Sequence, residues 1–409
     1  MERKVDVLVI GAGPAGIISA VTARKYYPEK KIVVMKSVAN GVIPCGIPYM
    51  FASLKDPDEN KLGNAALEKN NIDVVVDEAI KIGRSEKTVT TKNDQVFGYE
   101  KLILATGSEP ITPPIEGIDK EGVYPIYKDM VYLKKLIEDV KKAKNVLILG
   151  GGFIGVELAD EISKINGLNV SLVEMLPTLL PNSFDPEFSA IAQQTLESRG
   201  VTVLTGTKVE AISGKEKVEK VQLSSGKEID VDCIVIGIGG IPNTKMASDA
   251  GLNLGIGKGI LVDEYMRTTD SDIFAVGDCA VKRDFYTHKE IPVMLASTAT
   301  AEARIAGANL YILKVVRENK GTIAIYSTYI DGKVLGSAGL TENAAEKESF
   351  EIVTGNAEGV DKHPGTLPGA SKIKLKLIFS KNSGIILGGQ VAGGMSCGEI
   401  INLIGIAIQ

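Results

Sequence analysis

The sequence predicts an α/β fold with two parallel-sheet domains and a separate C-terminal α+β domain. The first observation is an internal repeat: an apolar strand runs into the pattern G-x-G-x-x-G at residues 11–16 and again at residues 150–155. The second is a change after residue 321, where alternating strands separated by short turns replace the strand–helix alternation. A chain of 409 residues is long enough for two to three domains.

The repeat has the pattern of a Rossmann-type dinucleotide-binding unit. Residues 7–10 form the apolar strand before the first glycines, and residues 146–149 form the strand before the second. Such glycines permit a tight turn and the close approach of a pyrophosphate, and the following helix offers unpaired N–H donors. One copy is a weak signal because glycine-rich turns are common. Two copies, each after an apolar strand, predict two nucleotide sites.

The two copies differ at the residue that should bind the ribose. A Rossmann unit carries Asp or Glu about 20 residues after its first glycine. The strand 170–173 ends at Glu174, and a carboxylate there favours NADH because it would repel the 2′-phosphate of NADPH. In the first copy Met35 takes this place, so backbone groups or Ser37 must hold the ribose. We therefore expect the first site to retain its nucleotide less tightly.

Composition excludes several classes of function. The net charge of −5 argues against a nucleic-acid partner, which needs clustered Lys and Arg. The apolar stretch at residues 7–23 is broken by glycines and Pro14, so it does not predict a signal peptide. No other uncharged apolar stretch reaches the ~20 residues of a membrane span. The four cysteines are far apart, so we expect no metal site and a reduced, cytoplasmic protein.

Cys45 is the residue on which the functional prediction depends. It lies between Pro44 and Gly46 and has no second cysteine near it in the sequence. A thiol in this position can take electrons from a flavin, but it cannot close a local disulfide. Only the thiolate is reactive, and we expect the N-terminus of a helix entered at Pro44 to lower its pKa.

Two further strands end in small-residue turns. Residues 102–104 lead into Ala105-Thr106-Gly107, and residues 272–276 lead into Gly277-Asp278, whose carboxylate can accept hydrogen bonds from a polyol. A helix is expected over residues 297–313. The C-terminal domain should then contain strands at residues 323–330, 333–338 and 372–380.

In this order and spacing, the motifs resemble the pyridine nucleotide-disulfide oxidoreductases, which are flavoproteins with two dinucleotide-binding domains. The resemblance covers essentially the whole chain. Met50 stands where the glutathione-reductase-like members have the second cysteine of C-x-x-x-x-C. The chain therefore resembles the single-cysteine branch of NADH oxidase, NADH peroxidase and coenzyme A-disulfide reductase. The resemblance implies an FAD-binding domain at 1–112 and 241–318, an NAD-binding domain at 113–240, and a dimerisation domain at 319–409.

The resemblance also implies a set of site residues. Cys45 would be catalytic, cycling between a thiolate and a sulfenic acid or mixed disulfide. Phe153 would cover the nicotinamide side of the flavin. The contacts to FAD and NADH would come from Gly11, Gly13, Pro14, Ala15, Gly16, Lys36, Ala79, Ala105, Thr106, Gly107, Gly152, Phe153, Ile154, Gly155, Glu174, Gly240, Asp278, Ser297 and Thr298.

The chain departs from the family pattern in three places, and the first two narrow the choice of electron acceptor. Pro14 stands where the peroxidases and many oxidases have a histidine, which weakens the case for peroxide reduction. Thr366-Leu367 stand where the coenzyme A-disulfide reductases have a tyrosine pair, although Arg24-Lys25 match their basic pair. The family usually continues with a further helix and loop beyond the position of Gln409.

The leading prediction is an FAD-dependent oxidoreductase that passes electrons from NADH through the flavin to Cys45 and reduces a small disulfide, persulfide or polysulfide. Coenzyme A is a candidate carrier of that sulfur, and a homodimer is expected. One alternative is an NADH oxidase that reduces O2 to hydrogen peroxide or water. Another, from a different class, is an electron-transfer flavoprotein with a protein acceptor.

The remaining thiols and histidines are expected to have smaller roles. Cys233 and Cys279 should be packed in the core, whereas Cys397 should be a surface or interface thiol. His288 should be exposed in a charged loop. For His363 a proton-relay role remains open.

Overall fold

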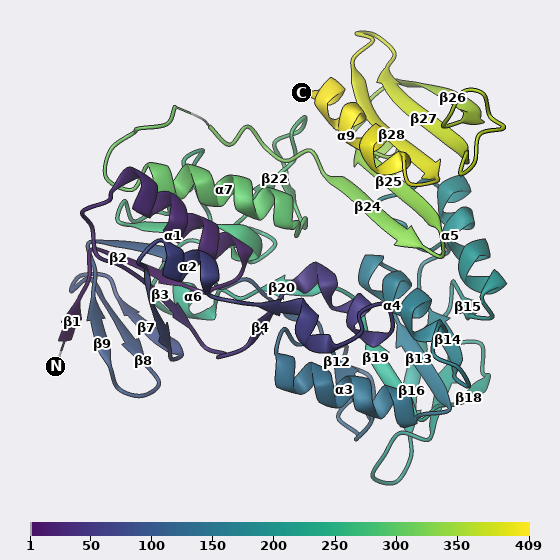
Figure 1. Cartoon of the computed structure of the whole chain (residues 1–409), viewed down its shortest axis with the longest axis horizontal. Helices are drawn as coiled ribbons and strands as arrows, with labels where there is room; N and C mark the ends of the chain where they lie inside the picture. The colour runs from purple at the N-terminus through teal and green to yellow at the C-terminus, as the bar shows by residue number, and fades with distance from the viewer. Residues whose placement is uncertain (1, 317) are drawn as a thin grey trace.

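The computed structural model describes residues 2–316 and 318–409, and its first glycine-rich turn lies on a five-stranded parallel sheet (Figure 1). The strand order is β21-β10-β2-β3-β6, and every pairing is parallel. The strands are β2 (Val7–Ile10), β3 (Ile32–Lys36), β6 (Asp73–Val76), β10 (Lys101–Leu104) and β21 (Ile273–Ala275). The predicted α/β class is confirmed, and β21 joins this sheet from far along the chain.

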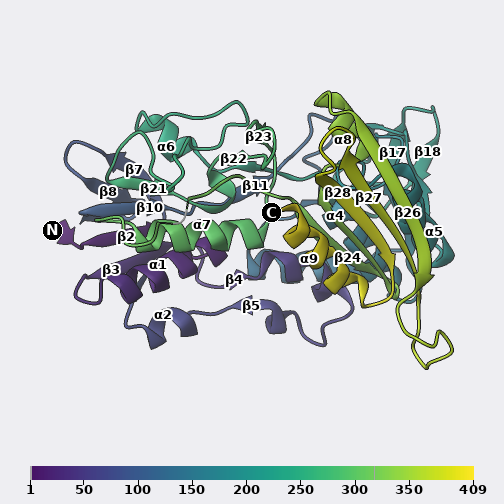
Figure 2. The same ribbon diagram turned by 90° about the horizontal axis from the view of Figure 1, so that it is seen from above.

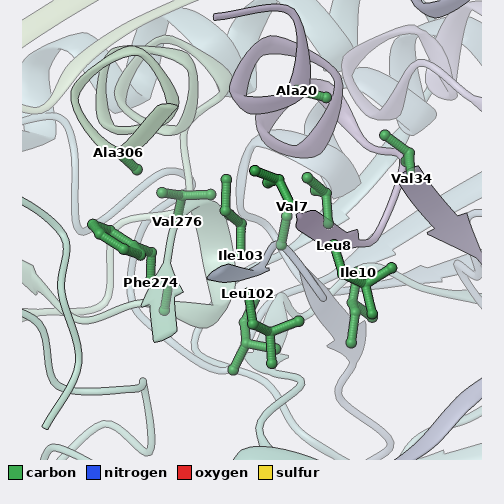
Figure 3. Packing of buried hydrophobic residues seen from close by; sticks show 14 of the residues in the cluster. Val7, Leu8, Ile10, Ala20, Val34, Leu102, Ile103, Phe274, Val276 and Ala306 are labelled. Carbon is green, nitrogen blue, oxygen red and sulfur yellow. The ribbon is translucent and has the colours of Figure 1, made fainter. Parts of the chain in front are cut away.

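Helices α1 (Pro14–Tyr26) and α7 (Ala296–Ala308) pack side by side on this sheet (Figure 2). Their contact surface is built from small residues: a Cβ on Gly307 would lie 2.6 Å from the Ser19 carbonyl oxygen. Ala20 and Ala306 face the apolar strands beneath them (Figure 3). Because Val and Ile fill the strands on both faces, the sheet is buried on both sides, as parallel sheets require.

Helix α7 ends at Ala308, so the expected helix over 297–313 was too long at its C-terminus. The side chain of Asn309 terminates the helix. Its Oδ1 accepts hydrogen bonds from the N–H groups of Lys314 and Val315, both at 2.9 Å, and its Nδ2 donates to the Val315 carbonyl oxygen at 3.0 Å. A short polar side chain that binds nearby backbone groups favours a turn over a helix.

A second five-stranded parallel sheet carries the second glycine-rich turn, in the order β12-β19-β13-β14-β15. Its strands are β12 (Val123–Pro125), β13 (Asn145–Leu149), β14 (Asn169–Val173), β15 (Thr202–Leu204) and β19 (Cys233–Ile236). Around it lie the helices α3 (Met130–Lys142), α4 (Phe153–Ser163) and α5 (Pro186–Ser198) and an antiparallel sheet of β16 (Val209–Ser213), β17 (Lys220–Leu223) and β18 (Glu228–Asp230).

The two parallel sheets are connected by a pair of short antiparallel strands, β11 (Ser108–Pro110) and β20 (Gly240–Pro242). A four-stranded sheet flanks the first parallel sheet. It contains β1 (Glu2–Lys4), β7 (Ala79–Gly83), β8 (Thr88–Thr91) and β9 (Val96–Gly98). The remaining short elements are β4 (Gly41–Val42), β5 (Lys61–Leu62), α2 (Ala65–Lys69), α6 (Lys245–Asp249), β22 (Lys282–Arg283), β23 (Glu290–Ile291) and the 3₁₀ turns η1 (Pro44–Gly46), η2 (Pro48–Phe51), η3 (Pro57–Asn60) and η4 (Gly277–Cys279).

The C-terminal part is an antiparallel sheet covered by a helix. The strand order is β24-β25-β28-β27-β26, and α9 (Cys397–Ile408) packs on β25 and β28. The other elements are β24 (Ile325–Ile330), β25 (Lys333–Gly339), α8 (Glu342–Lys347), β26 (Ile352–Val360), β27 (Lys372–Ser380) and β28 (Ile386–Gly393). Strand β24 begins two residues later than expected, because its pairing with β25 starts with Ile325 opposite Ala338 and β25 itself ends at Gly339.

A buried polar cluster ties this C-terminal sheet to the second parallel-sheet domain. The ammonium group of Lys376 lies 2.9 Å from Asp185, 2.7 Å from Glu187 and 2.9 Å from Glu342. Gln390 donates to Asp185 at 2.6 Å. Each charge in the cluster has a partner, which is what makes its burial tolerable.

Cys397, expected at the surface or at an interface, is buried. It opens α9 on the side that faces the sheet, where its sulfur would lie 3.1 Å from a Cβ on Gly393. The expectation was wrong because the glycine-rich turn before it brings the helix start against β28. Within residues 2–316 and 318–409, no helix is both long and apolar enough to cross a membrane.

Candidate active site

The two glycine-rich turns have nearly the same geometry. Gly11 and Gly150 adopt φ of +107° and +112°, a region that side chains disfavour. A Cβ on Gly16 would lie 1.9 Å from the Gly11 carbonyl oxygen, and a Cβ on Gly155 would lie 1.8 Å from the Gly150 carbonyl oxygen. Packing of helix against strand therefore requires glycine at the first and last positions of both motifs.

The middle glycines of the motifs are free of that constraint. Gly13 and Gly152 have φ of −74° and −75° and form the N-caps of α1 and α4 without a side-chain cap. A Cβ at either position would meet no atom of the described residues within 4 Å. Unpaired N–H groups beside an open backbone suit a pyrophosphate, so both turns fit the dinucleotides expected there.

Glu174 lies where the ribose of the second nucleotide is expected. It follows β14 and is 8% exposed. One carboxylate oxygen accepts the N–H of Gly151 at 2.6 Å, and the other accepts the N–H of Leu176 at 2.7 Å. Two backbone donors fix this carboxylate beside the glycine-rich turn.

The first site has a different residue at the matching place. Met35 was expected at this place, but the strand register puts Lys36, the last residue of β3, where the second site has Glu174, and Met35 is fully buried in the core. The Lys36 ammonium donates to the Ala39 carbonyl oxygen and to the Asn64 side chain, both at 2.9 Å. Burial, with a smaller effect from Lys61, lowers its pKa. The first site therefore presents a cation where the second presents an anion.

The expected contacts of the first nucleotide follow the carboxyl ends of strands in one sheet. Pro14 and Ala15 follow β2, Lys36 ends β3, Ala79 lies just after β6, and Ala105 follows β10. Ligands of open α/β sheets bind at this edge. The structure thus brings these residues to the same edge of the sheet, although Ala79 itself opens a strand of the neighbouring sheet.

The turn at 105–107 and Asp278 are linked through their neighbours. Thr106 donates its hydroxyl to the Asn243 carbonyl oxygen at 2.6 Å, and the N–H of Asn243 donates to the Gly107 carbonyl oxygen at 2.9 Å. Ser108 donates its hydroxyl to Asp278 at 2.8 Å. Ser297 and Thr298 lie in the first turn of α7, whose Glu302 accepts the N–H of the residue before Asp278.

Gly240 and Ile154 lie at the edges of this arrangement. Gly240 pairs with Pro110 in the strands that connect the two halves, and Ile154 is 41% exposed in the first turn of α4. Phe153, at the start of the same helix, stacks on Tyr326 of β24 with ring centroids 4.9 Å apart and planes 19° apart. The C-terminal sheet thus supports the aromatic ring predicted to lie over the flavin.

Cys45 is an exposed, free thiol on the short turn η1. Partial desolvation raises its pKa; Glu157 and Asp278 raise it further, and Lys128 opposes them. The expected lowering of this pKa by a helix N-terminus was wrong, because η1 is a single 3₁₀ turn with little dipole. Desolvation, together with the charges of Glu157 and Asp278, outweighs it.

Sequence reasoning missed two charged residues near Cys45. Glu157 lies one helical turn after Phe153 on α4, accepts the Thr328 hydroxyl at 2.8 Å, and has its pKa raised to about 7 by burial and by Glu161 and Asp160. The four-residue spacing from Phe153 could have indicated that both face the same way. Lys128 donates to the Ser108 hydroxyl at 2.9 Å and lies 3.5 Å from Asp278, and no local pattern marks it.

Arg24, one residue of the basic pair that matches the coenzyme A-disulfide reductases, binds backbone carbonyl groups of its own chain. The Arg24 guanidinium donates to the carbonyl oxygens of Pro28, Lys30, Asn70 and Asn71 at 2.7 to 3.1 Å. These four bonds give Arg24 a structural role. The match therefore adds little support for coenzyme A contacts.

Cys233 and Cys279 are buried, and His288 is exposed, as expected. His363 is exposed in the connection between β26 and β27, and its relay role stays a prediction.

Comparison with known proteins gives the class. The pyridine nucleotide-disulphide oxidoreductase pattern matches residues 5–303, and the dimerisation-domain pattern of the same proteins matches residues 326–409. An NADH oxidase of Methanocaldococcus jannaschii is 35% identical, covering 98% of this chain and 90% of the relative.

Two further similar proteins are named as reductases of sulfur compounds. An NAD(P)H coenzyme A polysulfide/persulfide reductase of Pyrococcus horikoshii is 28% identical over 96% of this chain and 88% of its own. The solved structure of an NAD-dependent persulfide reductase from A. fulgidus is similar with a TM-score of 0.92 and 31% identity, covering 100% of this chain and 77% of that one.

Fold, site and relatives together define an oxidoreductase with two dinucleotide sites. The chain belongs to the pyridine nucleotide-disulphide oxidoreductase family, as the sequence motifs predicted. The expected cofactors, FAD and a nicotinamide nucleotide, are those of this family.

Proposed function

We propose that this enzyme uses NADH to reduce a small persulfide, polysulfide or disulfide through Cys45. The observation that carries the proposal is the place of this thiol. It is exposed and free, and its pKa responds to Asp278 on the FAD side and to Glu157 on the helix of the second glycine-rich turn. Among the four cysteines of the chain it is the exposed one, so the chemistry is that of a single thiol.

The steps at Cys45 follow from thiol chemistry. Its thiolate attacks one sulfur of R–S–S–R′, a bond forms between Cys45 and that sulfur, and the other half leaves as a thiolate and takes a proton. FAD, held by the first glycine-rich turn and Asp278, would supply the two electrons from NADH that cleave the mixed disulfide. Cleavage releases the second thiol and regenerates Cys45. For a persulfide, RSSH, the reaction with NADH and one proton gives RSH, hydrogen sulfide and NAD⁺.

Residues of the chain assist these steps by position and charge. The Lys128 ammonium opposes the carboxylates near Cys45, so it favours the thiolate and the departing sulfur anion. Glu157, whose pKa is raised to about 7, can hold a proton at neutral pH. Glu174 would bind the ribose hydroxyls of NADH and repel the phosphate of NADPH.

NADH oxidation by O2 is the second candidate, and the M. jannaschii relative named NADH oxidase favours it. In this reaction two electrons from NADH give hydrogen peroxide, and four give water, the latter through a Cys45 sulfenic acid. Pro14, in place of the histidine of the peroxidases and many oxidases, weighs against the water-forming route, which has to reduce peroxide at Cys45.

The test is steady-state NADH consumption by the wild type and by Cys45→Ser, with coenzyme A persulfide, coenzyme A disulfide or polysulfide as acceptor and with O2 controlled. We expect the substitution to lower sulfur-dependent kcat/KM by ~100-fold or more, because it removes the nucleophile. Sulfur-dependent turnover that survives Cys45→Ser would contradict the proposal. O2-dependent turnover alone would favour the oxidase, and reduction of a protein acceptor alone would favour an electron-transfer component.

We also propose the domain division and assembly expected from the sequence: an FAD-binding domain at 1–112 and 241–318, an NAD-binding domain at 113–240, and a C-terminal domain at 319–409 that forms a homodimer. The parallel pairing of β21 with β10 supports a discontinuous first domain. The match of residues 326–409 to a dimerisation domain supports the homodimer. Four free cysteines support a reducing, cytoplasmic location.

A further inference from the structure

A buried ion pair lies beneath the turn that carries Asp278. Lys282 of β22 and Glu302 of α7 approach to 3.1 Å, and their side chains are 3% and 2% exposed. Neither residue belongs to a motif that the sequence singled out. The pair is among the most deeply buried charges in the described part of the chain.

This ion pair binds both polar groups of Gly277. The Lys282 ammonium donates to the carbonyl oxygens of Gly277 at 2.6 Å and Ala280 at 2.8 Å. A Glu302 carboxylate oxygen accepts the N–H of Gly277 at 2.9 Å. Gly277 has φ of +75°, a conformation that needs support from its surroundings.

The held turn lies between two parts of the proposed FAD site. On one side, a Cβ on Gly277 would lie 2.9 Å from the Cβ of Ala15, in the first turn of α1. On the other side, Asp278 accepts the hydroxyl of Ser108 at 2.8 Å. A shift of Gly277 would therefore displace the Asp278 carboxylate relative to the first glycine-rich turn.

Stability alone does not account for this ion pair. Apolar residues often replace a buried ion pair at no cost to folding, because burial removes both charges from water. Here the second Glu302 oxygen is also buried without a hydrogen-bond partner among the described residues, which is itself unfavourable. Unlike apolar residues, the pair supplies a donor for the carbonyl oxygen of Gly277 and an acceptor for its N–H.

We propose that Lys282 and Glu302 are positioning residues of the FAD site, which together hold Gly277 in its left-handed conformation and so direct the Asp278 carboxylate to the polyol chain of the flavin nucleotide. The inference rests on the proposed contact between Asp278 and FAD. It does not depend on which acceptor Cys45 reduces.

The test compares FAD binding in Lys282→Met, Glu302→Gln and the wild type. The dissociation constant is measured from the FAD fluorescence released when the holoprotein is diluted, and the bound flavin is examined by visible circular dichroism. We expect about tenfold or more weaker binding in Lys282→Met, because it leaves a buried carboxylate and two carbonyl groups without their donor. Glu302→Gln keeps an acceptor for Gly277, so a smaller loss is expected.

Lys376→Met is the matched control, because Lys376 is an equally buried lysine bound to carboxylates, in the C-terminal sheet. It should lower the unfolding temperature but change the FAD dissociation constant less than about twofold. If Lys376→Met weakens FAD binding as much as Lys282→Met does, the effect is general destabilisation and the proposal is wrong.

The double variant Lys282→Met with Glu302→Leu covers the case in which a single variant fails to fold. Apolar replacement of both partners should restore much of the stability but not the FAD affinity or the visible circular dichroism of the wild type. Wild-type FAD affinity in this double variant would overturn the proposal. The measurement uses no NADH or acceptor, so it is separate from the Cys45→Ser test.

Discussion

At the scale of single residues, desolvation and nearby charges together shift the pKa of the Cys45 thiol. Its pKa is raised by partial desolvation and by the carboxylates of Glu157 and Asp278, while Lys128 lowers it. A raised pKa leaves a smaller fraction of thiolate at neutral pH than an ordinary cysteine has, so reactivity should climb as pH rises toward and above 9. This pH dependence is expected for the free thiol, before a substrate is bound.

We predict that Lys128→Met raises this pKa further and slows alkylation of Cys45 by iodoacetamide about threefold at pH 8, because a cation that lowers the pKa is lost. Glu157→Gln should have the opposite sign. The measurement is the pH–rate profile of alkylation, with Cys45→Ser reporting the background from the buried thiols. Lys217→Met, at an exposed and distant lysine, serves as the control. An unchanged profile in Lys128→Met would contradict the prediction.

At the scale of elements, two glycines of the second glycine-rich turn have different roles, one in folding and the other in nucleotide binding. Gly155 has no room for a side chain, since its Cβ would lie 1.8 Å from the Gly150 carbonyl oxygen. Gly152 has room within the protein, since its Cβ would meet no described atom within 4 Å. The two positions are three residues apart, but a substitution at Gly155 tests folding, whereas a substitution at Gly152 tests nucleotide binding.

We predict that Gly155→Ala lowers the free energy of unfolding by about 1–3 kcal/mol through overpacking. Gly152→Ala should change it by less than about 1 kcal/mol, because its φ of −75° suits alanine and the loss at the N-cap is partly offset in the unfolded chain. It should nevertheless raise the KM for NADH about tenfold by obstructing the pyrophosphate. Urea unfolding and initial rates check both. If Gly152→Ala bound NADH normally, the second glycine-rich turn would not be part of the NADH site.

The same elements show what the sequence can and cannot predict. Residues 7–10 and 372–380 form strands with the expected bounds, because apolar or alternating runs between turn residues reflect local preferences. The end of α7 depends on a side-chain contact of Asn309, which periodicity does not report. The raised pKa of Cys45 and the bond between Thr328 and Glu157 depend on residues far apart in sequence, which only the fold brings together.

At the scale of the whole molecule, the C-terminal sheet is fixed to the second parallel-sheet domain and presents one helix outward. The Lys376 cluster and the stacking of Tyr326 on Phe153 make the first connection. In α9, Ile401 and Ile408 are buried against the sheet, whereas Leu403 and Ile406 are 64% and 68% exposed. An apolar outer face on a helix of a dimerisation domain suits contact with a second copy.

We predict that the wild type has twice the 43.4 kDa mass of one chain in light scattering, and that Leu403→Glu combined with Ile406→Glu has the mass of one chain. Two carboxylates buried without partners in a two-fold interface would cost more than the contact gains. Circular dichroism should show that the variant stays folded, because neither side chain packs in the core. Ile256→Glu, at a 94% exposed residue between α6 and β21, should remain dimeric. A dimeric double variant would place the interface elsewhere on the C-terminal domain, and a monomeric wild type would contradict the homodimer itself.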